Sequence, residues 1–405
     1  MKNIAILGST GSIGRSTLSV IASYPERFRL VSIAAGKNVK VALEQVRRWK
    51  PRVVSVSTPA DAEALALQLK REGLADIEVT NGAEGTVRVA THPDADFVVS
   101  AIVGVAGLKA TYEAVRAGKN VGLANKECLV AAGELITAEA RRQGKPLLPI
   151  DSEHNAVHQC LRGGTPQEVR RIWLTASGGP FLHTPKSEFE SITVEQALNH
   201  PTWKMGQRIT IDSATMMNKG FEVIEACRLF NVPPSQVEVI VHPQSTIHSM
   251  VEFVDGSILA QLSVTDMRLP ILYALTWPER VPSDLRFSPG ALRQLDFAPP
   301  DLDKFPCLRL AYEAAEAGGA KPIALNAADE VAVAAFLDGR IQFADIPRII
   351  SAVLNETEAF KPESIEKVLA LDVEARRRAE TKVAGRFGTR PQAVVSSPDS
   401  GRVRD

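Results

Sequence analysis

The segment Leu148–His154 places two acidic side chains directly after a short apolar run. Residues 146–150 are predicted to form a buried strand, and Asp151, Ser152 and Glu153 follow it. Because side chains two apart in extended backbone share a face, Asp151 and Glu153 are expected to point together. Close carboxylates need a cation or a proton between them, and oxygen ligands suit Mg²⁺ or Mn²⁺. Taken alone, the triplet is more simply explained as two solvated acids.

A second polar segment covers residues 209–226. Ser213, Asn218 and Lys219 offer a hydroxyl, an amide and a positive charge, a combination that can bind a phosphate group. Glu222 follows on a predicted helix and is surrounded by apolar residues. Glu225 is its i+3 neighbour, so the spacing leaves open which of the two belongs to a site and which is merely solvated.

Three glycines, Gly8, Gly11 and Gly14, lie between a predicted strand at 4–7 and a helix that opens at Arg15. Such a turn lets backbone approach a pyrophosphate at a helix N-terminus. The spacing is GxxGxxG rather than GxGxxG, but the strand–turn–helix order and a second strand at 28–35 favour a dinucleotide site over a plain turn.

The end of that second strand bears on the choice of cofactor. Gly36, Lys37 and Asn38 follow it, with no acid for the ribose hydroxyl of NAD(H). Lys37 could meet a 2′-phosphate, which favours NADP(H). A lysine that simply starts the next helix is the alternative.

Two further loops combine residues typical of ligand binding. Residues 177–181 offer the Ser177 hydroxyl and backbone N–H groups to an anion. Residues 199–206 include His200, Trp203 and Gly206 without helical or strand periodicity. This second loop is interpreted as a mobile lid or as a packed surface loop.

Strands and helices alternate up to residue 150, which predicts a parallel sheet with helices on both faces. Ligands of such sheets bind at the carboxyl ends of the strands, where the polar segments fall. The predicted fold is α/β: a Rossmann-like doubly wound domain, a central α+β catalytic and dimerisation domain with a hairpin turn at Asp255-Gly256, and a small helical domain. The predicted boundaries are 1–149, 150–277, a linker at 278–301, 302–383, and a disordered tail at 384–405.

Composition limits the classes of protein. The chain has 405 residues, with 47 Lys+Arg against 47 Asp+Glu, so charge gives no reason to expect nucleic acid or an anionic membrane as partner. No apolar run approaches the roughly 18 residues of a membrane span, and no signal peptide is recognised. The four cysteines form no CxxC pair, which fits a reduced, cytoplasmic protein.

Six motifs occur together and in order, and they resemble the 1-deoxy-D-xylulose 5-phosphate reductoisomerase family from residue 1 to about residue 380. They are Gly8–Gly14, Ala124–Glu127, Pro149–His154, Thr175–Phe181, His200–Gly206 and Asp212–Gly220. The resemblance implies an NADPH- and divalent-metal-dependent enzyme (Mg²⁺ or Mn²⁺, with Co²⁺ possible) of the non-mevalonate isoprenoid pathway. It would convert 1-deoxy-D-xylulose 5-phosphate into 2-C-methyl-D-erythritol 4-phosphate, as a homodimer.

The resemblance also assigns roles by position. It implies a metal site of Asp151, Glu153 and Glu222, with Lys126 at the reacting end and a flap that closes with Trp203. The implied substrate contacts are Ser152, Ser177, His200, Ser213, Asn218 and Lys219. The implied NADPH contacts are Thr10, Gly11, Ser12, Ile13, Gly36, Lys37, Asn38, Asn125, Glu127 and Gly206.

Other classes and other polar residues fit less well. A semialdehyde dehydrogenase-like enzyme would need a cysteine in a turn suited to attack, and a non-catalytic NADP-binding regulator has no use for three convergent carboxylates. His242 and His248 are interpreted as polar positions in strands, and Asp329-Glu330 as a solvated helix face.

Overall fold

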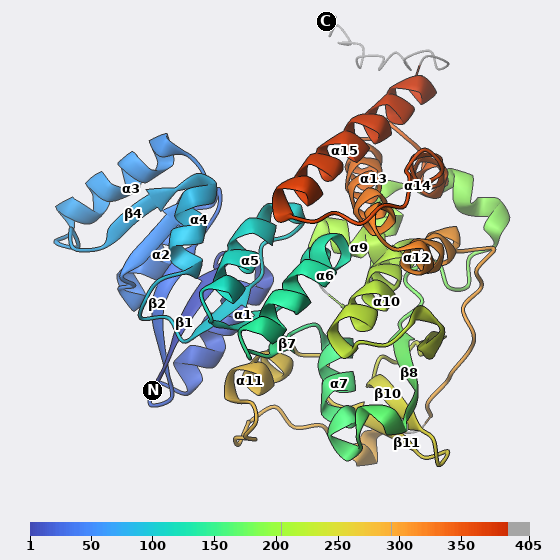
Figure 1. Ribbon diagram of the computed structural model, residues 1–405, viewed down its shortest axis with the longest axis horizontal. Coiled ribbons are helices and arrows are strands. Elements are labelled where there is room, and N and C mark those ends of the chain that lie inside the picture. The colour runs from blue at the N-terminus through green and yellow to red at the C-terminus, as the bar shows by residue number, and fades with distance from the viewer. Residues whose placement is uncertain (204, 293, 388–405) are drawn as a thin grey trace, which may run out of the picture.

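The computed structural model describes residues 1–203, 205–292 and 294–387, and within these ranges it contains two sheets and three groups of helices (Figure 1). The predicted tail at 384–405 mostly lies outside the described residues. Its first four residues belong to helix α15, which continues to Phe387. Among the described helices, none is long and apolar enough to cross a membrane.

The N-terminal sheet has seven strands in the order β4-β3-β2-β1-β5-β6-β7, and every neighbouring pair is parallel. Its central strands are continuous apolar runs because helices cover both faces, and they separate two hydrophobic clusters. This confirms the Rossmann-like prediction. The strands are β1 Lys2–Leu7, β2 Phe28–Ala34, β3 Val53–Val56, β4 Glu78–Asn81, β5 Phe97–Ser100, β6 Asn120–Leu123 and β7 Leu147–Pro149.

Each helix of this region comes after one of these strands in the chain and packs on the sheet. They are α1 Ser12–Ser23, α2 Val39–Trp49, α3 Pro59–Arg71, α4 Gly82–Ala90, α5 Leu108–Arg116 and α6 Lys126–Arg142. Strand β4 and helix α4 were not predicted. Strand β4 is a partly exposed edge strand without an apolar run, so its sequence gives little signal.

The second sheet has the order β11-β10-β8-β9. Strands β10 and β11 are antiparallel, and the predicted turn at Asp255-Gly256 joins them, with Gly256 at a φ of 87°. The strands are β8 Val169–Ala176, β9 Val237–Val241, β10 Ile247–Phe253 and β11 Ile258–Leu262. The helices around them are α7 Ser152–Cys160, α8 Val194–Leu198, α9 Gln207–Ala214 and α10 Met217–Phe230.

After the second sheet the chain returns to the N-terminal region. Helix α11, Arg268–Thr276, packs against α1 and adds Ile271 and Leu275 to the N-terminal core. The remaining helices form the group at the upper right of Figure 1 and pack on α6 and α10. They are α12 Pro306–Ala317, α13 Ala320–Leu337, α14 Asp345–Asn355 and α15 Ile365–Phe387. The exact domain boundaries stay a prediction.

Candidate active site

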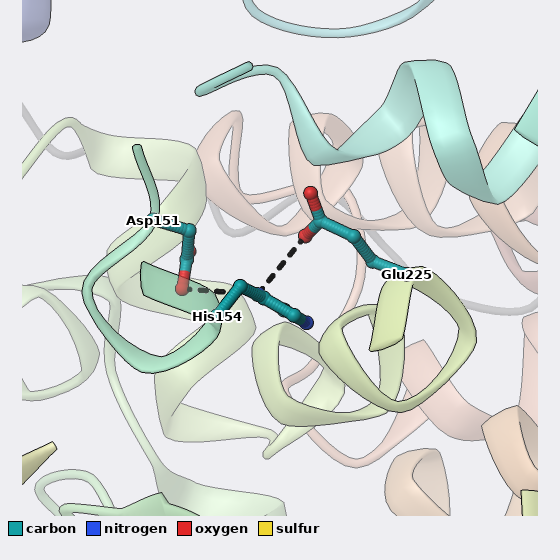
Figure 2. Close-up of side chains that lie close together, drawn as sticks. All are labelled: Asp151, His154 and Glu225. Carbon is teal, nitrogen blue, oxygen red and sulfur yellow. Dashed lines mark hydrogen bonds and ion pairs between the residues drawn. The ribbon is translucent and has the colours of Figure 1, made fainter. Parts of the chain in front are cut away.

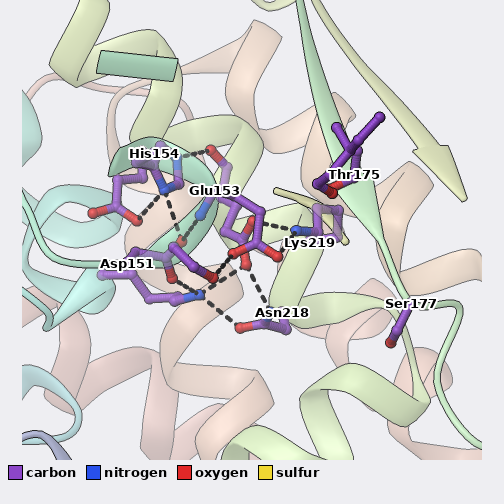
Figure 3. Close-up of polar contacts among 12 residues, drawn as sticks. Asp151, Glu153, His154, Thr175, Ser177, Asn218 and Lys219 are labelled. Atoms are coloured by element: carbon purple, nitrogen blue, oxygen red, sulfur yellow. Dashed lines mark hydrogen bonds and ion pairs between the residues drawn. The ribbon is translucent and has the colours of Figure 1, made fainter. Parts of the chain in front are cut away.

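Three carboxylates from two distant segments, the start of α7 and helix α10, meet in space. Figure 3 labels two of them, Asp151 and Glu153, together with Asn218 and Lys219 of α10. Ligand oxygens of Asp151, Glu153 and Glu222 all lie within 4.8 Å of one another. The predicted extended backbone at Asp151 and Glu153 is wrong, because α7 begins at Ser152. Asp151 is the N-cap of α7, its Oδ1 accepts from the Glu153 amide at 3.2 Å, and Glu153 lies in the first helical turn. Capping and packing therefore bring these acids together.

Two lysine ammonium groups lie between the carboxylates. The Lys126 Nζ is 2.9 Å from Asp151 Oδ2 and 3.0 Å from Glu222 Oε1. The Lys219 Nζ is 3.2 Å from Glu153 Oε1 and pairs closely with Glu222. Asn218 joins this cluster, accepting from Lys126 at 2.7 Å and donating to Glu222 at 2.7 Å. Two positive charges therefore face three acids.

The protonation of this cluster depends on burial. Burial raises the pKa of Glu153 to about 7. Burial also opposes ionisation of Asp151, but the Lys126 ammonium holds the pKa of Asp151 well below its usual range. Burial disfavours the charge on Lys126, yet Asp151 and Glu222 raise the pKa of Lys126 well above its usual range. One acid therefore titrates near neutral pH, and the cluster can take up one more positive charge.

A second group, Asp151, His154 and Glu225, lies beside the first (Figure 2). The His154 Nδ1 is 3.3 Å from Asp151 Oδ1 and 3.4 Å from Glu225 Oε2, while its Nε2 is 2.9 Å from the backbone oxygen of Glu222. Glu225 is fully buried, so it is not a solvated residue. A ring that faces a carbonyl and two carboxylates must carry both protons. Burial alone would lower the pKa of His154, but Glu225 and Asp151 raise it to about 9.

The two groups differ in what they can hold. In the second, the doubly protonated His154 ring has no free nitrogen lone pair with which to ligate a metal. The first offers only oxygen ligands, the donor set that Mg²⁺ and Mn²⁺ prefer. Asp151, Glu153 and Glu222 therefore fit a divalent cation, and it is the all-oxygen donor set that favours Glu222 over Glu225 as the third ligand.

A cavity of about 260 Å³ lies beside Ser152, the residue between Asp151 and Glu153. Ser152, Trp203 and His248 line it, together with residues of α11 and of 279–287. The Trp203 and His248 rings are 6.3 Å apart, and the Ser152 hydroxyl donates to Glu153 Oε2 at 2.6 Å. The predicted flap residue Trp203 thus lines a cavity together with Ser152, the residue between two of the carboxylates.

The loop after β8 lies apart from the carboxylates, as the position of Ser177 in Figure 3 shows. The His200 Nδ1 accepts from the Thr202 and Trp203 amides, so its Nε2 carries the proton and donates to Ser177 Oγ at 3.1 Å. Gly179 has a φ of +65°, and a Cβ there would be 2.6 Å from the Ser213 oxygen. Ser177, His200 and Ser213 therefore lie around one loop, whereas Asn218 and Lys219 are engaged by the acids.

The predicted nucleotide residues lie at the carboxyl ends of β1 and β2. Gly11 is the N-cap of α1 without a side-chain cap, which leaves N–H groups free for an anion. A Cβ on Gly14 would collide with backbone of Gly8 and Ser9, so close packing of this turn requires glycine. Of the remaining residues, Thr10 donates to the Ala35 oxygen, Asn38 caps α2, Gly36 and Lys37 are exposed, and Ser12 and Ile13 open α1.

Three other residues predicted to contact NADPH, Asn125, Glu127 and Gly206, cap helices or bond to other protein groups in this structure. Asn125 caps α6 through Cys128 and donates to the Gly104 oxygen at 3.0 Å. Glu127 Oε1 accepts from the Gly104 amide at 3.0 Å and from Arg208 Nη1 at 2.7 Å. Gly206 is the N-cap of α9. Their roles in cofactor binding stay predictions.

Sequence reasoning did not single out His154 or Arg208, and it was wrong about Asp329. Asp329 is fully buried and lies 3.6 Å from Arg208 Nη2. Helix α13 is apolar on all sides, which indicates a buried helix whose acids must be paired. That pattern could have identified the acid. His154 is i+3 from Asp151, as Glu225 is from Glu222, and this spacing was the signal for the second group.

Three domain profiles match the chain. They are 1-deoxy-D-xylulose 5-phosphate reductoisomerase over residues 4–133, its C-terminal domain over 147–230, and the DXP reductoisomerase C-terminal domain over 262–378. The 1-deoxy-D-xylulose 5-phosphate reductoisomerase of Methylococcus capsulatus is 54% identical over 94% of this chain and 98% of its own. The chain belongs to the 1-deoxy-D-xylulose 5-phosphate reductoisomerase family. The Anaeromyxobacter sp. (strain K) reductoisomerase is 52% identical over 95% of this chain and 98% of its own.

Solved reductoisomerase structures have the same fold. A DOX-P reductoisomerase in complex with NADPH, fosmidomycin and magnesium has a TM-score of 0.90 at 42% identity, covering 95% of this chain and 98% of its own. The Zymomonas mobilis reductoisomerase in complex with NADPH has a TM-score of 0.88 at 45% identity, covering 94% and 99%. The resemblance read from the six motifs is confirmed.

Proposed function

We propose that this protein converts 1-deoxy-D-xylulose 5-phosphate into 2-C-methyl-D-erythritol 4-phosphate, with NADPH as reductant and a divalent metal as cofactor. The observation that carries the proposal is the convergence of Asp151, Glu153 and Glu222 beside Lys126. This convergence occurs in a family whose solved members bind NADPH and magnesium. Another two-domain NADP oxidoreductase or a non-catalytic regulator is not favoured.

The reaction rearranges the carbon skeleton next to a carbonyl and then reduces the resulting aldehyde. Asp151, Glu153 and Glu222 would hold the cation, which polarises the substrate carbonyl and stabilises negative charge on its oxygens. Lys126 adds a positive charge at the same place and holds Asp151 and Glu222 in position. The glycine turn and the α1 N-terminus bind the pyrophosphate of NADPH, and Lys37 meets its 2′-phosphate.

The phosphate end of the substrate has its own binding residues. Ser177, His200 and Ser213 lie around one loop and offer hydroxyl and N–H donors, with Asn218 and Lys219 on the carboxylate side. Anchoring the non-reacting end lets binding energy orient the reacting carbons. The flap residue Trp203 lines the cavity beside Ser152, and closure of the flap would exclude water while the carbon skeleton rejoins.

The test is the loss of NADPH absorbance after addition of 1-deoxy-D-xylulose 5-phosphate. Chelator-stripped protein should be nearly inactive and should recover on addition of Mg²⁺ or Mn²⁺, because the carboxylates alone do not polarise a carbonyl. Equal rates with and without metal would contradict the assigned site. NADH in place of NADPH serves as the control for the cofactor.

The proposal includes a homodimer. Strand β11 is an edge strand, and Ile258, Leu259 and Leu262 are exposed along it together with the nearby Val254. Exposed apolar edge strands are normally covered. Light scattering should give twice the chain mass for the protein and a lower mass for Leu259→Arg; a monomeric parent protein would overturn this part.

A cytoplasmic location is also proposed. The four cysteines Cys128, Cys160, Cys227 and Cys307 carry free thiols, as expected in a reducing compartment. Recovery of the native protein in a membrane or periplasmic fraction would contradict it.

A further inference from the structure

Arg208 is the centre of a buried group of charges outside the carboxylate site, here called the Arg208 cluster. It lies in the first turn of α9, two residues after the flap residue Gly206. Its side chain is 17% exposed and contacts acids from two other helices, α6 and α13. The cluster consists of Glu127, Arg208, Asp212, Asp329, Glu330 and Arg376.

One side of the cluster reaches the residue next to Lys126. The Arg208 Nη1 is 2.7 Å from Glu127 Oε1, and the same oxygen accepts from the Gly104 amide at 3.0 Å. Glu127 follows Lys126 in the first turn of α6. Fixing the side chain of Glu127 therefore also restrains the backbone of Lys126. Asn125, the cap of the same helix, also bonds Gly104. Arg208 thus restrains both the start of α6 and the loop after β5.

The other side reaches the C-terminal helices. The Arg208 Nη1 is 3.0 Å from Glu330 Oε1, and its Nη2 is 3.2 Å from Asn326 Oδ1, both on α13. Glu330 in turn pairs with Arg376 of α15 at 2.6 Å. A chain of ion pairs therefore runs from α15 through α13 to Arg208, the second residue after the flap.

We propose that Arg208 is a positioning residue that ties the C-terminal end of the flap to the start of α6 and to α13, and so controls flap opening together with the placement of Lys126. This inference rests on the proposed function, because the flap and Lys126 take their roles from it. Arginine suits the position, since its planar guanidinium can reach Glu127, Glu330 and Asn326 at once. A lysine would keep the charge but could not span these acceptors.

The test uses two variants, because loss of Arg208 itself leaves several buried acids without their cation and strongly destabilises the fold. Arg208→Lys keeps the positive charge but loses the planar guanidinium. Glu330→Gln removes the negative charge on α13 that pairs with Arg208, with little change in side-chain shape. Both should speed deuterium uptake in residues 199–206 by about fivefold and raise the KM for the sugar phosphate by a similar factor. Their kcat should fall less.

Arg228→Gln is the matched control. Arg228 also pairs with α6, through Glu134 at 3.1 Å, but it lies on α10 and does not reach the flap. It should leave uptake in 199–206 and the KM unchanged. Variants of Arg208 and Glu330 that lower Tm without altering either readout would overturn the proposal. A parent protein without turnover would contradict the proposed function but not the role of Arg208 at the flap, because deuterium uptake is measured without substrate.

Discussion

Two consecutive residues at the start of α6 belong to two different buried charge clusters. Lys126 faces Asp151 and Glu222, whereas Glu127 faces Arg208. In the first cluster the positive charges are lysine ammonium groups, compact charges that can be exchanged for another cation. In the second the charge is a planar guanidinium bonded to several elements. The first cluster is suited to chemistry and the second to holding the chemistry in place.

The largest expected effect separates Glu222 from its neighbour Glu225. Glu222→Gln should lower turnover by roughly 10²–10³-fold, because a metal ligand is lost and the cation contributes several kcal/mol to transition-state stabilisation. Binding of NADPH, measured by its fluorescence, should be nearly unchanged.

Glu225→Gln is the matched comparison, since this acid is equally buried one turn away. Its effect on turnover should be clearly smaller. A larger loss in Glu225→Gln than in Glu222→Gln would assign the metal to the His154 group instead.

The next effect contrasts the two kinds of positive charge. Arg208→Met should lower the free energy of unfolding by about 3–5 kcal/mol, because it leaves buried carboxylates unpaired. Lys126→Met should also destabilise the chelator-treated protein, but here Mg²⁺ should restore most of the loss, since the cation replaces the missing charge.

Chemical denaturation of both variants with and without Mg²⁺ measures how much of the lost free energy of unfolding the cation restores. Equal recovery of Arg208→Met and Lys126→Met would mean that the clusters do not differ as described. Failure of Mg²⁺ to stabilise Lys126→Met would argue against a cation among Asp151, Glu153 and Glu222.

A smaller effect concerns the pH dependence of the Arg208 cluster. Burial raises the pKa of Asp212 from its ordinary value of 3.8 to about 6. The folded protein then holds this proton more tightly than the unfolded chain. The contribution is fully present below pH 3.8 and is lost as the pH rises through about 6. It should amount to about 3 kcal/mol.

Asp212→Asn removes this titration. The difference in free energy of unfolding between parent and variant should therefore change between pH 4 and 6 and stay constant above. A difference that is flat across the whole range would show that Asp212 ionises normally in the folded protein.

Much of the fold followed from the sequence, for a physical reason. Strands β1, β2 and β5 are buried on both faces, and their apolar runs and the glycine turn after β1 are local signals. Strand β4 was not predicted, because an exposed edge strand needs no continuous run of apolar residues. The acids Asp151, Glu153 and Glu222 were predicted together through the family motifs, although the local geometry assumed for the first two was wrong.

The Arg208 cluster could not be predicted in the same way. Its members are separated by up to about 250 positions in the chain, and each taken alone has the appearance of an ordinary surface charge. The apolar pattern of α13 indicates that Asp329 and Glu330 need partners, but which residues supply those partners is a property of the tertiary fold. The same holds for Glu225, because its i+3 spacing from Glu222 does not show that His154 is its partner.

The most direct test of the account is to locate the metal. Crystals grown with Mn²⁺ and NADPH should show one anomalous-scattering peak within coordination distance of the carboxylates of Asp151, Glu153 and Glu222. A peak among Asp151, His154 and Glu225, or no peak at either group, would contradict the assignment.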